Sequence, residues 1–505
     1  MHSLVYLATR RWNKDEGRKE GIQQLALSHV TKAFPTDDWE NRKVWRQHLP
    51  HALRVLASMG SDGSEDACKL GYWVGRCLHV DGKARQAVGI LGHVVAVEET
   101  ILAEDHPGRL ASQHSLAIAY KANGQVAEAV KLFEHVVSIR EMTLAEDHPG
   151  RLASQHALAI AYEANGQVTK AVKLLEHVVA VEETILAEDH PDRLASQHAL
   201  AGAYQANGQI TEAVKLLEHV VAIREITLAE DHPSRLASQH ELAGAYQADG
   251  QIKEAVKLLE HVVAVKRITL REDHPSRLVS QHELAGAYQA DGEIKEAVKL
   301  LEHVVAVERI TLREDHPSRL VSQHELAGAY QADGEIKEAV KLLEHVVAVK
   351  EITLREDHPS RLVSQHELAG AYQADGQIKE AVKLLEHVVA IREITLREDH
   401  PSRLASQHEL AGAYQADGQI TEAVKLLEHV VAIREITLRE DHPSRLVSQH
   451  ELARAYQADG QITEAVKLLK HVVAIQPRIW AEDDFRRQVS NDLLQLCYKL
   501  LEGVS

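Results

Sequence analysis

The sequence predicts an all-α protein, specifically a right-handed α-solenoid of stacked helical hairpins. Three observations support this prediction. One 42-residue unit recurs nine times between residues 107 and 484 without insertion or deletion. Apolar residues within the unit follow helical spacing, and no β-rich run interrupts them. Fixed self-similarity of this length is typical of architectures that stack one supersecondary unit on the next.

The first helix of the unit is best seen after Pro275. Proline suits the first turn of a helix because its missing N–H has no partner there, and Asp273 or His274 can cap the helix. The apolar residues that share one face of this helix are Leu278, Leu284, Ala285 and Tyr288. Gly292 then ends the helix by supplying the left-handed conformation of a tight C-terminal turn.

The second helix of the unit has an apolar inward face. Its members are Ala297, Leu300, Leu301, Val304, Val305 and Val307. The small side chains of Ala285 and Ala297 allow the two helices to approach closely, while Tyr288 fills the gap between hairpins. Because one hairpin cannot bury its apolar stripe alone, we expect stability to come from stacking on its neighbours.

The spacing Leu284-Ala285-x-x-Tyr288-x-x-x-Gly292-x-x-x-x-Ala297 resembles the signature of the tetratricopeptide (TPR) repeat. The 42-residue length and the Arg-Ile-Thr-Leu-x-x-Asp-His-Pro linker resemble the long TPR variant of kinesin light chains and of fungal NOD-like receptors. The resemblance implies stacked TPR hairpins with a protein-binding role. Such a fold hosts many functions, so the resemblance does not identify the partner.

The chain begins with an irregular segment, residues 1–20. Its sequence Met1-His2-x-Leu4-Val5-x-Leu7-Ala8-Thr9-Arg10-x-Trp12 resembles the end of the winged-helix region that follows the NB-ARC domain in fungal NOD-like receptors. This resemblance implies an NB-ARC domain upstream in a longer native chain. Kinesin light chains instead carry a heptad coiled coil upstream, and no heptad pattern is visible here.

Residues 21–64 predict a degenerate helical pair, with helices over 22–33 and 39–59. Pro50 predicts a kink or break in the second helix because proline removes a backbone donor. Trp39, Trp45 and Leu49 form the expected local core. The run Gly-Ser-Asp-Gly-Ser over 60–64 indicates a turn.

The remaining chain divides into three parts. Residues 65–106 predict a degenerate TPR-like repeat, and residues 107–484 predict nine regular TPR repeats. Residues 485–505 predict a C-terminal capping helix, with one face on the last repeat and a polar face outward. The apolar face of this helix holds Val489, Leu493, Leu494 and Leu500. Terminal repeats are commonly atypical because they cap the stack.

Net charge restricts the partners. The chain carries −18, and residues 1–64 hold ten Lys/Arg against seven Asp/Glu, so the rest carries −21. Nucleic-acid binding usually needs a basic face, and the repeats offer the reverse. Two interpretations stay open: a merely solvated acidic surface, or a preference for basic partners.

The cysteine content and the lengths of the apolar runs indicate the compartment. The three cysteines are too few and too unevenly spaced for a disulfide framework, which favours a reducing compartment. No apolar run reaches the roughly 18 residues of a membrane span. We therefore expect a cytoplasmic protein without a membrane-embedded part.

The sequence offers no catalytic, cofactor or metal motif. The single Gly-Lys pair, Gly82-Lys83, is followed by alanine and lacks the first glycine of a phosphate-binding loop. Of the 33 histidines, 27 recur three to a repeat, so equivalent ones should lie about one helix spacing apart, ~8–10 Å, too far to share a metal ion. Structural or exposed histidines are the first interpretation, and a pH-responsive ladder is the second. We expect no enzyme.

A protein or peptide partner is expected in a concave groove lined by the first helix of each repeat. By alignment with the TPR motif, its positions in one repeat are Val279, His282, Glu283, Gly286, Gln289 and Ala290. The groove candidates across the array are His198, His240, Glu241, Gln247, His282, Glu283, Gln289, His324, Glu325, Gln331, His366, Glu367, Gln373, His408, Glu409 and Gln415. TPR domains that clamp C-terminal carboxylates need Lys, Arg and Asn there, which these positions lack.

The repeats that begin at Pro275 and Pro317 differ at only two positions, an adjacent pair near the end of the second helix. The candidates for variable specificity are Lys266, Arg267, Glu308, Arg309, Lys350, Glu351, Arg392 and Glu393. A charge reversal on a copied scaffold has two explanations, neutral drift at a solvated site or tuning of recognition. The hypothesis here is that specificity lies in these pairs and in the groove.

The sequence therefore predicts a non-enzymatic binding solenoid. Its first interpretation is the ligand-sensing repeat region of a fungal NOD-like receptor, with an immune or self/non-self role. The alternative is a stand-alone adaptor or scaffold similar to kinesin light chain repeats, and a regulatory subunit of an enzyme is a third class. The ligand and the oligomeric state are not determined.

Overall fold

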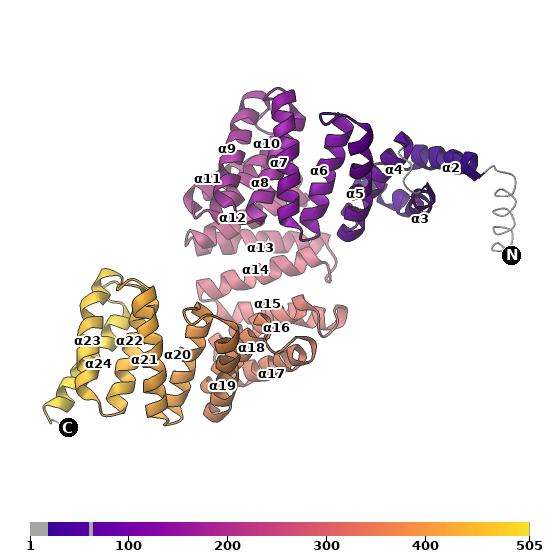
Figure 1. Cartoon of the computed structure of the whole chain (residues 1–505). Helices are drawn as coiled ribbons and strands as arrows, with labels where there is room; N and C mark the ends of the chain where they lie inside the picture. The colour runs from indigo at the N-terminus through magenta and orange to yellow at the C-terminus, as the bar shows by residue number, and fades with distance from the viewer. Residues whose placement is uncertain (1–18, 60–63, 504–505) are drawn as a thin grey trace, which may run out of the picture. The chain divides into compact units, whose positions relative to one another are not determined.

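The structure is a computed structural model that describes residues 19–59 and 64–503, and every regular element in that part is helical (Figure 1). The N-terminal helices are α2 (Lys19–Ala33), the 3₁₀ helix η1 (Trp39–Asn41), α3 (Arg42–Met59), α4 (Glu65–Val80) and α5 (Ala84–Ile101). The first regular hairpins are α6 (Pro107–Ala122), α7 (Val126–Thr143), α8 (Pro149–Ala164), α9 (Val168–Ile185), α10 (Pro191–Ala206), α11 (Ile210–Thr227), α12 (Pro233–Ala248) and α13 (Ile252–Thr269). The later hairpins are α14 (Pro275–Asp291), α15 (Ile294–Thr311), α16 (Pro317–Asp333), α17 (Ile336–Thr353), α18 (Pro359–Ala374), α19 (Ile378–Thr395), α20 (Pro401–Ala416), α21 (Ile420–Thr437), α22 (Pro443–Ala458) and α23 (Ile462–Ile475). The 3₁₀ helix η2 (Gln476–Arg478) and α24 (Phe485–Leu501) end the described chain.

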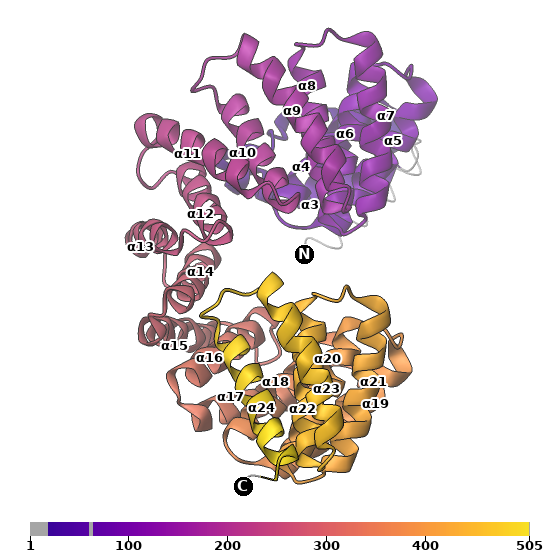
Figure 2. The same cartoon turned by 90° about the vertical axis from the view of Figure 1, so that its left-hand side faces the viewer.

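The helices form a TPR-like solenoid, as the periodicity predicts. Contacts divide the chain into two compact units, Met1–Leu258 and Leu259–Ser505. Within each unit, helices follow one another in chain order, which both views show (Figures 1 and 2). We call the first helix of each hairpin, the even-numbered α4 to α22, an A helix, and the second, the odd-numbered α5 to α23, a B helix.

Local chemistry sets the ends of each A helix. Of the two expected caps, His274 caps α14, since its Nδ1 accepts a hydrogen bond from the Ser276 N–H at 3.2 Å. Gly292 has φ +83° and ends the same helix, as expected. The Glu293 N–H then donates to the Tyr288 carbonyl at 2.8 Å, which closes the turn into the B helix. The same histidine cap and left-handed glycine recur along the array.

The hydrophobic core lies between one hairpin and the A helix of the next. One cluster joins α18 and α19 to α20, and its fully buried alanines, Ala369 and Ala381, allow close helix contact. Its other buried members are Val382, Leu385, Val389, Leu410 and Ala413. Since part of the contact surface belongs to the following repeat, a hairpin is stable only when stacked.

A tyrosine on each A helix ties successive repeats together. The Tyr330 hydroxyl donates to Glu302 on the preceding B helix at 2.8 Å. Equivalent bonds run from Tyr162, Tyr204, Tyr246, Tyr288, Tyr372, Tyr414 and Tyr456. The half-buried ring packs between repeats, as expected, while its hydroxyl reaches the surface.

The N-terminal helices have their own dense core. Trp45 is fully buried with Leu49 and Leu27 at the contact of α2, α3 and α4, whereas the side chain of Trp39 lies outside the described residues. Of the kink or break expected at Pro50, the break does not occur, because α3 continues through this residue to Met59. Residues 1–18, which hold the segment that resembles an NB-ARC-associated region, lie outside the described residues.

The C-terminal helix α24 caps the last hairpin in part as expected. Asp484 replaces the usual histidine cap and accepts the Arg486 N–H at 2.9 Å, and Leu494 and Cys497 are buried on the last repeat. The polar residues Gln488, Asn491, Asp492 and Gln495 are exposed, as expected. The expected apolar face is wrong in part, because Val489 and Leu500 are also exposed, as are Phe485, Leu496 and Leu501. Among the described helices, none is long and apolar enough to cross a bilayer.

Two glycines of one A helix should respond in opposite ways to alanine. Gly292→Ala forces a side chain onto φ +83° and should destabilise the protein by about 1 kcal/mol or more. Gly286→Ala fills open space inside α14 and should stabilise it by up to about 1 kcal/mol, because alanine favours helix. Urea denaturation followed by circular dichroism measures both. Equal shifts of the two midpoints would contradict the assigned turn.

Candidate partner-binding surfaces

The exposed acids of the A helices form the first candidate surface. The structure places Glu241, Glu283, Glu325, Glu367 and Glu409 at exposed positions of successive A helices, and neighbours such as α18 and α20 contact each other. Burial and repulsion from Glu451 and Glu367 raise the pKa of Glu409. The carboxylates of consecutive repeats therefore lie close enough to repel, and a cation placed among them would relieve that repulsion.

The glutamines and histidines expected in the same groove are half-buried. The glutamines in question are Gln247, Gln289, Gln331, Gln373 and Gln415. Nδ1 of His408 lies 3.2 Å from the Ser448 hydroxyl of the next A helix, and His198 and His366 make the equivalent contacts. His240, His282 and His324 occupy the same position in their repeats. These imidazoles therefore belong to the contact between repeats as much as to the groove.

The variable pair is split between inside and outside. Lys266, Glu308, Lys350 and Arg392 are 3–8% exposed, so the expectation that they are solvated is wrong for this first member. Arg267, Arg309, Glu351 and Glu393 are exposed. The reason is helical geometry: the first residue points back to the following A helix, and the second points out. Only the second member can meet a partner.

The buried member of the pair is hydrogen-bonded to the next repeat. Lys350 Nζ donates to the Ser364 hydroxyl at 2.7 Å and to the Ser360 carbonyl at 3.1 Å. Where this residue is acidic, as at Glu182, the serine hydroxyl donates to it instead, and burial raises the pKa of Glu182 to about 7. A serine can donate or accept, so either charge is accommodated. Sequence reasoning missed this serine, although it recurs in every repeat.

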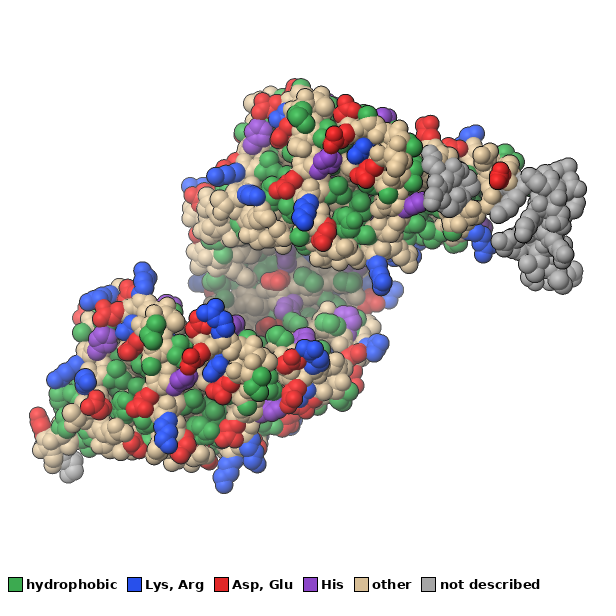
Figure 3. Space-filling view, viewed as in Figure 1, with side chains coloured by type: hydrophobic (Ala, Val, Ile, Leu, Met, Phe, Trp, Pro, Cys, Tyr) green, Lys and Arg blue, Asp and Glu red, His purple; other side chains and the backbone are tan. Residues whose placement is uncertain are grey.

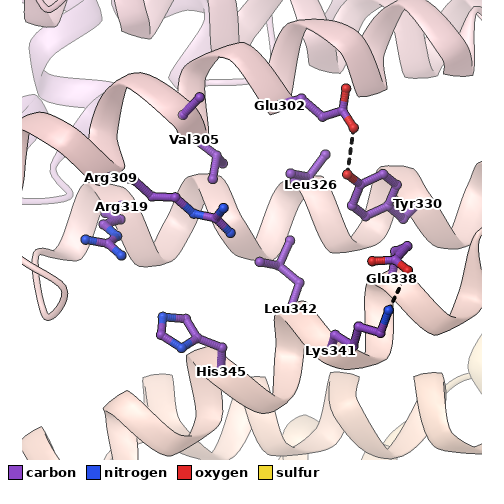
Figure 4. A pocket seen from close by; sticks show the side chains of 11 residues that line it. Glu302, Val305, Arg309, Arg319, Leu326, Tyr330, Glu338, Lys341, Leu342 and His345 are labelled. Atoms are coloured by element: carbon purple, nitrogen blue, oxygen red, sulfur yellow. Dashed lines mark hydrogen bonds and ion pairs between the residues drawn. The ribbon is translucent and has the colours of Figure 1, made fainter.

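A row of pockets between successive B helices forms the second candidate surface, which the sequence did not predict. One of them, about 630 Å³, lies between α15 and α17 over a floor from α16 (Figure 4). Equivalent pockets of about 590 and 420 Å³ lie at α19–α21 and α13–α15. Successive A helices touch, whereas an intervening A helix separates the B helices and leaves these hollows.

The face seen in Figure 3 has no large patch of one charge or of apolar residues. Acidic, basic and histidine side chains are interspersed over it. Within the described chain, no group of three His, Cys, Asp or Glu residues is arranged to hold a metal. Cys68, Cys77 and Cys497 are buried, and none of the three is in a disulfide.

These features define a class, the α-solenoid of stacked helix hairpins. The tetratricopeptide repeat profile matches nine overlapping segments that together span residues 65–478. They are residues 65–142, 116–184, 150–226, 192–268, 234–309, 276–352, 318–394, 360–436 and 402–478. The chain belongs to the tetratricopeptide repeat family, as its resemblance implies.

The chain is also similar to solved structures. Nearly identical TPR-like repeats of a Podospora anserina protein, described as a candidate kinesin light chain, are 68% identical and cover 41% of this chain and 99% of that one, with a TM-score of 0.39. A glutamine-to-methionine variant of those repeats is 67% identical and covers 41% of this chain and 97% of its own, also with a TM-score of 0.39. The apo form of RapI is 11% identical, covers 73% of this chain and 97% of its own, and has a TM-score of 0.52, which shows the fold alone. No curated protein matches the chain.

Two buried groups predict opposite pH effects on stability. Burial, with Arg434 and Arg454 nearby, lowers the pKa of His408 to about 4, against about 6.5 in the unfolded chain. The unfolded chain therefore binds the extra proton first, and this histidine costs stability as the pH falls through 6.5. At pH 5 the cost is about 2 kcal/mol. His408→Gln should thus be relatively more stable at pH 5 than at pH 7.5.

Glu182→Gln is the matched control with the opposite sign. The pKa of Glu182 lies at about 7 in the folded protein, above the ordinary value of 4.5, so its ionisation costs stability as the pH rises. Removing the charge should help more at pH 8 than at pH 6. Urea midpoints across this range measure both variants, and parallel pH profiles for them and the unaltered chain would contradict the two assignments.

Proposed function

We propose that this protein is a non-enzymatic interaction scaffold whose A helices bind a basic segment of a protein partner. The observation that carries the proposal is the exposed Glu409, which is repelled by Glu367 and by the half-buried Glu451, although Glu451 is also paired with Arg454 at 2.7 Å. A lysine- or arginine-bearing segment would offset that repulsion, and charge complementarity speeds encounter and selects partners. The net charge of −18 favours the same kind of partner.

The adaptor interpretation is the better supported setting. The 68% identical repeats belong to a protein described as a candidate kinesin light chain, and the match covers almost all of that chain. By this likeness, the protein would bridge a cargo protein to a larger assembly. Three cysteines without a disulfide agree with work in the reducing cytoplasm.

The exposed members of the variable pair would refine the choice of partner. Arg267, Arg309, Glu351 and Glu393 change sign on a scaffold that is otherwise copied, and each lies at the surface. Their buried neighbours contribute to the contact between repeats and only indirectly to recognition.

Charge reversal on the A helices tests the function. A triple variant should bind a fluorescein-labelled lysine-rich peptide about tenfold or more weakly, as measured by anisotropy at fixed salt. This variant combines Glu283→Lys, Glu325→Lys and Glu367→Lys. The charge-matched control replaces exposed linker acids and combines Glu272→Lys, Glu314→Lys and Glu356→Lys. This control should bind the peptide nearly as well as the unaltered chain does. Equal loss in both variants would leave only general electrostatics and contradict an A-helix site.

A second candidate, the sensor region of a fungal NOD-like receptor, rests on one observation. Residues 1–12 resemble the segment that follows the NB-ARC domain in that family. The test is the full-length transcript, read in frame upstream of Met1. A phosphate-binding Gly-x-x-x-x-Gly-Lys-Ser/Thr loop encoded there would favour the receptor. A stop codon and a true 5′ end there would contradict the receptor interpretation and leave the adaptor interpretation.

A further inference from the structure

In most repeats, an acid on the B helix completes a polar contact with the following A helix. Glu351 Oε1 accepts a hydrogen bond from Gln365 Nε2 at 3.0 Å and lies 3.6 Å from the Arg361 guanidinium. The same two donors meet Glu183 and Glu435 in their repeats. One carboxylate oxygen therefore serves a buried amide and an arginine at once.

Two consecutive repeats lack this acid because arginine replaces it, at Arg267 and Arg309. The glutamines that would meet it, Gln281 and Gln323, are 0% exposed, and neither amide atom of either side chain has a partner. Elsewhere the same glutamine donates its Nε2. A buried amide without partners costs about 1–3 kcal/mol, so these junctions are incomplete as they stand.

Each arginine lines a pocket between B helices. In the larger one, Arg309, Arg319 and His345 lie at one end, and the pairs Glu302–Tyr330 and Glu338–Lys341 lie at the other (Figure 4). Apolar side chains from all three helices lie between the ends, and they are Val305, Leu326 and Leu342. Glu302 and Glu338 are thus already engaged within the pocket.

The basic side chains at the end of the pocket that holds Arg309 can still bind an anion. The Arg319 guanidinium donates only to the Leu312 carbonyl, at 3.3 Å, and its Nε has no partner. His345 lies 3.5 Å from Glu314 of the preceding linker, a side chain that is 63% exposed. Among the ion pairs of the described residues, none involves Arg309. Guanidinium groups bind carboxylates through strong, charge-assisted hydrogen bonds.

We propose that the pockets at Arg267 and Arg309 bind acidic side chains of a protein partner, whose carboxylates pair with the arginines that replace the glutamate of neighbouring repeats. The methylene stem of a glutamate fits the apolar middle of the pocket, and its carboxylate meets the two arginines. The comparable pocket at Glu393 holds its own acid beside Arg403 and Gln407, so it is already satisfied. The site goes beyond the proposed function, since it lies on the B helices and selects the opposite charge.

The pocket at Arg267 repeats the arrangement one unit earlier. Its wall includes Arg267 and His303, and Glu260 and Glu296 are engaged by Tyr288 and Lys299. Two adjacent sites of this kind favour a partner segment with two acidic residues, because the second carboxylate binds at high effective concentration once the first is held.

Charge substitution in the full chain tests the proposal with a fluorescein-labelled peptide of alternating glutamate and leucine. Arg267→Glu and Arg309→Glu combined should weaken binding of this probe about tenfold or more by anisotropy. Arg271→Glu and Arg313→Glu combined make the same charge change on exposed linkers of the same repeats and should keep most of the affinity. Glu351→Arg should add a third site and tighten binding.

Three results would overturn the proposal: equal loss in the two double variants, full binding by the Arg267→Glu, Arg309→Glu variant, or no gain from Glu351→Arg. A peptide with phosphoserine in place of glutamate that binds more tightly and depends on the same arginines would assign the sites to phosphate instead. Folding is checked by thermal melting, where Arg309→Glu should raise the midpoint because Gln323 gains its acceptor. The A-helix variants with lysine should still bind the acidic probe, so this proposal and the proposed function can be contradicted independently of each other.

Discussion

The structure depends on one interface, the contact between a helical hairpin and the A helix that follows it. Ala369 and Ala381 let α18 and α19 pack closely, but the cluster also needs Leu410 and Ala413 of α20 to be complete. The same cluster recurs one repeat later with Ala411 and Ala423. Because neither hairpin contains a complete core, folding of each repeat is coupled to its neighbours.

That apolar contact is accompanied by a buried polar one, which explains what the repeats are free to vary. At several junctions the A-helix serine meets a histidine from the previous A helix and a charged residue from the previous B helix, as Ser448 meets His408 and Arg434. Its hydroxyl can donate or accept, so the charge at the B-helix position can reverse, although one carboxylate oxygen of Glu182 and of Glu308 is left without a partner. The neighbouring glutamine is less tolerant, because its amide nitrogen needs an acceptor that only an acidic residue provides.

The two faces of the solenoid consequently differ in chemistry. On the A helices, acids of successive repeats lie close together and repel, which suits a basic partner. On the B helices, pockets remain because the intervening A helix separates them, and one end of each pocket carries either an arginine, as at Arg309, or a glutamate, as at Glu393. A repeat array can therefore change what it binds by single substitutions while its core stays the same, which is consistent with nearly identical repeats that differ at one pair.

The sequence by itself determined the helical hairpin, its period, its ends and its family, because these follow from local spacing: apolar residues at helical intervals, Pro275 at the start of a helix and Gly292 at its end. It also determined which residues of the A helices face outward, such as Glu283 and Glu367. Only the tertiary structure decided the rest. That Lys350 is buried, that Gln323 has no partner and that pockets lie between B helices all depend on how one hairpin packs on the next. The exposure of Val489 and Leu500 on α24, which were expected to face inward, also depends on how the last hairpin packs. Contacts between residues 14 or 40 positions apart, such as Lys350 with Ser364 and His408 with Ser448, have no signature in local periodicity.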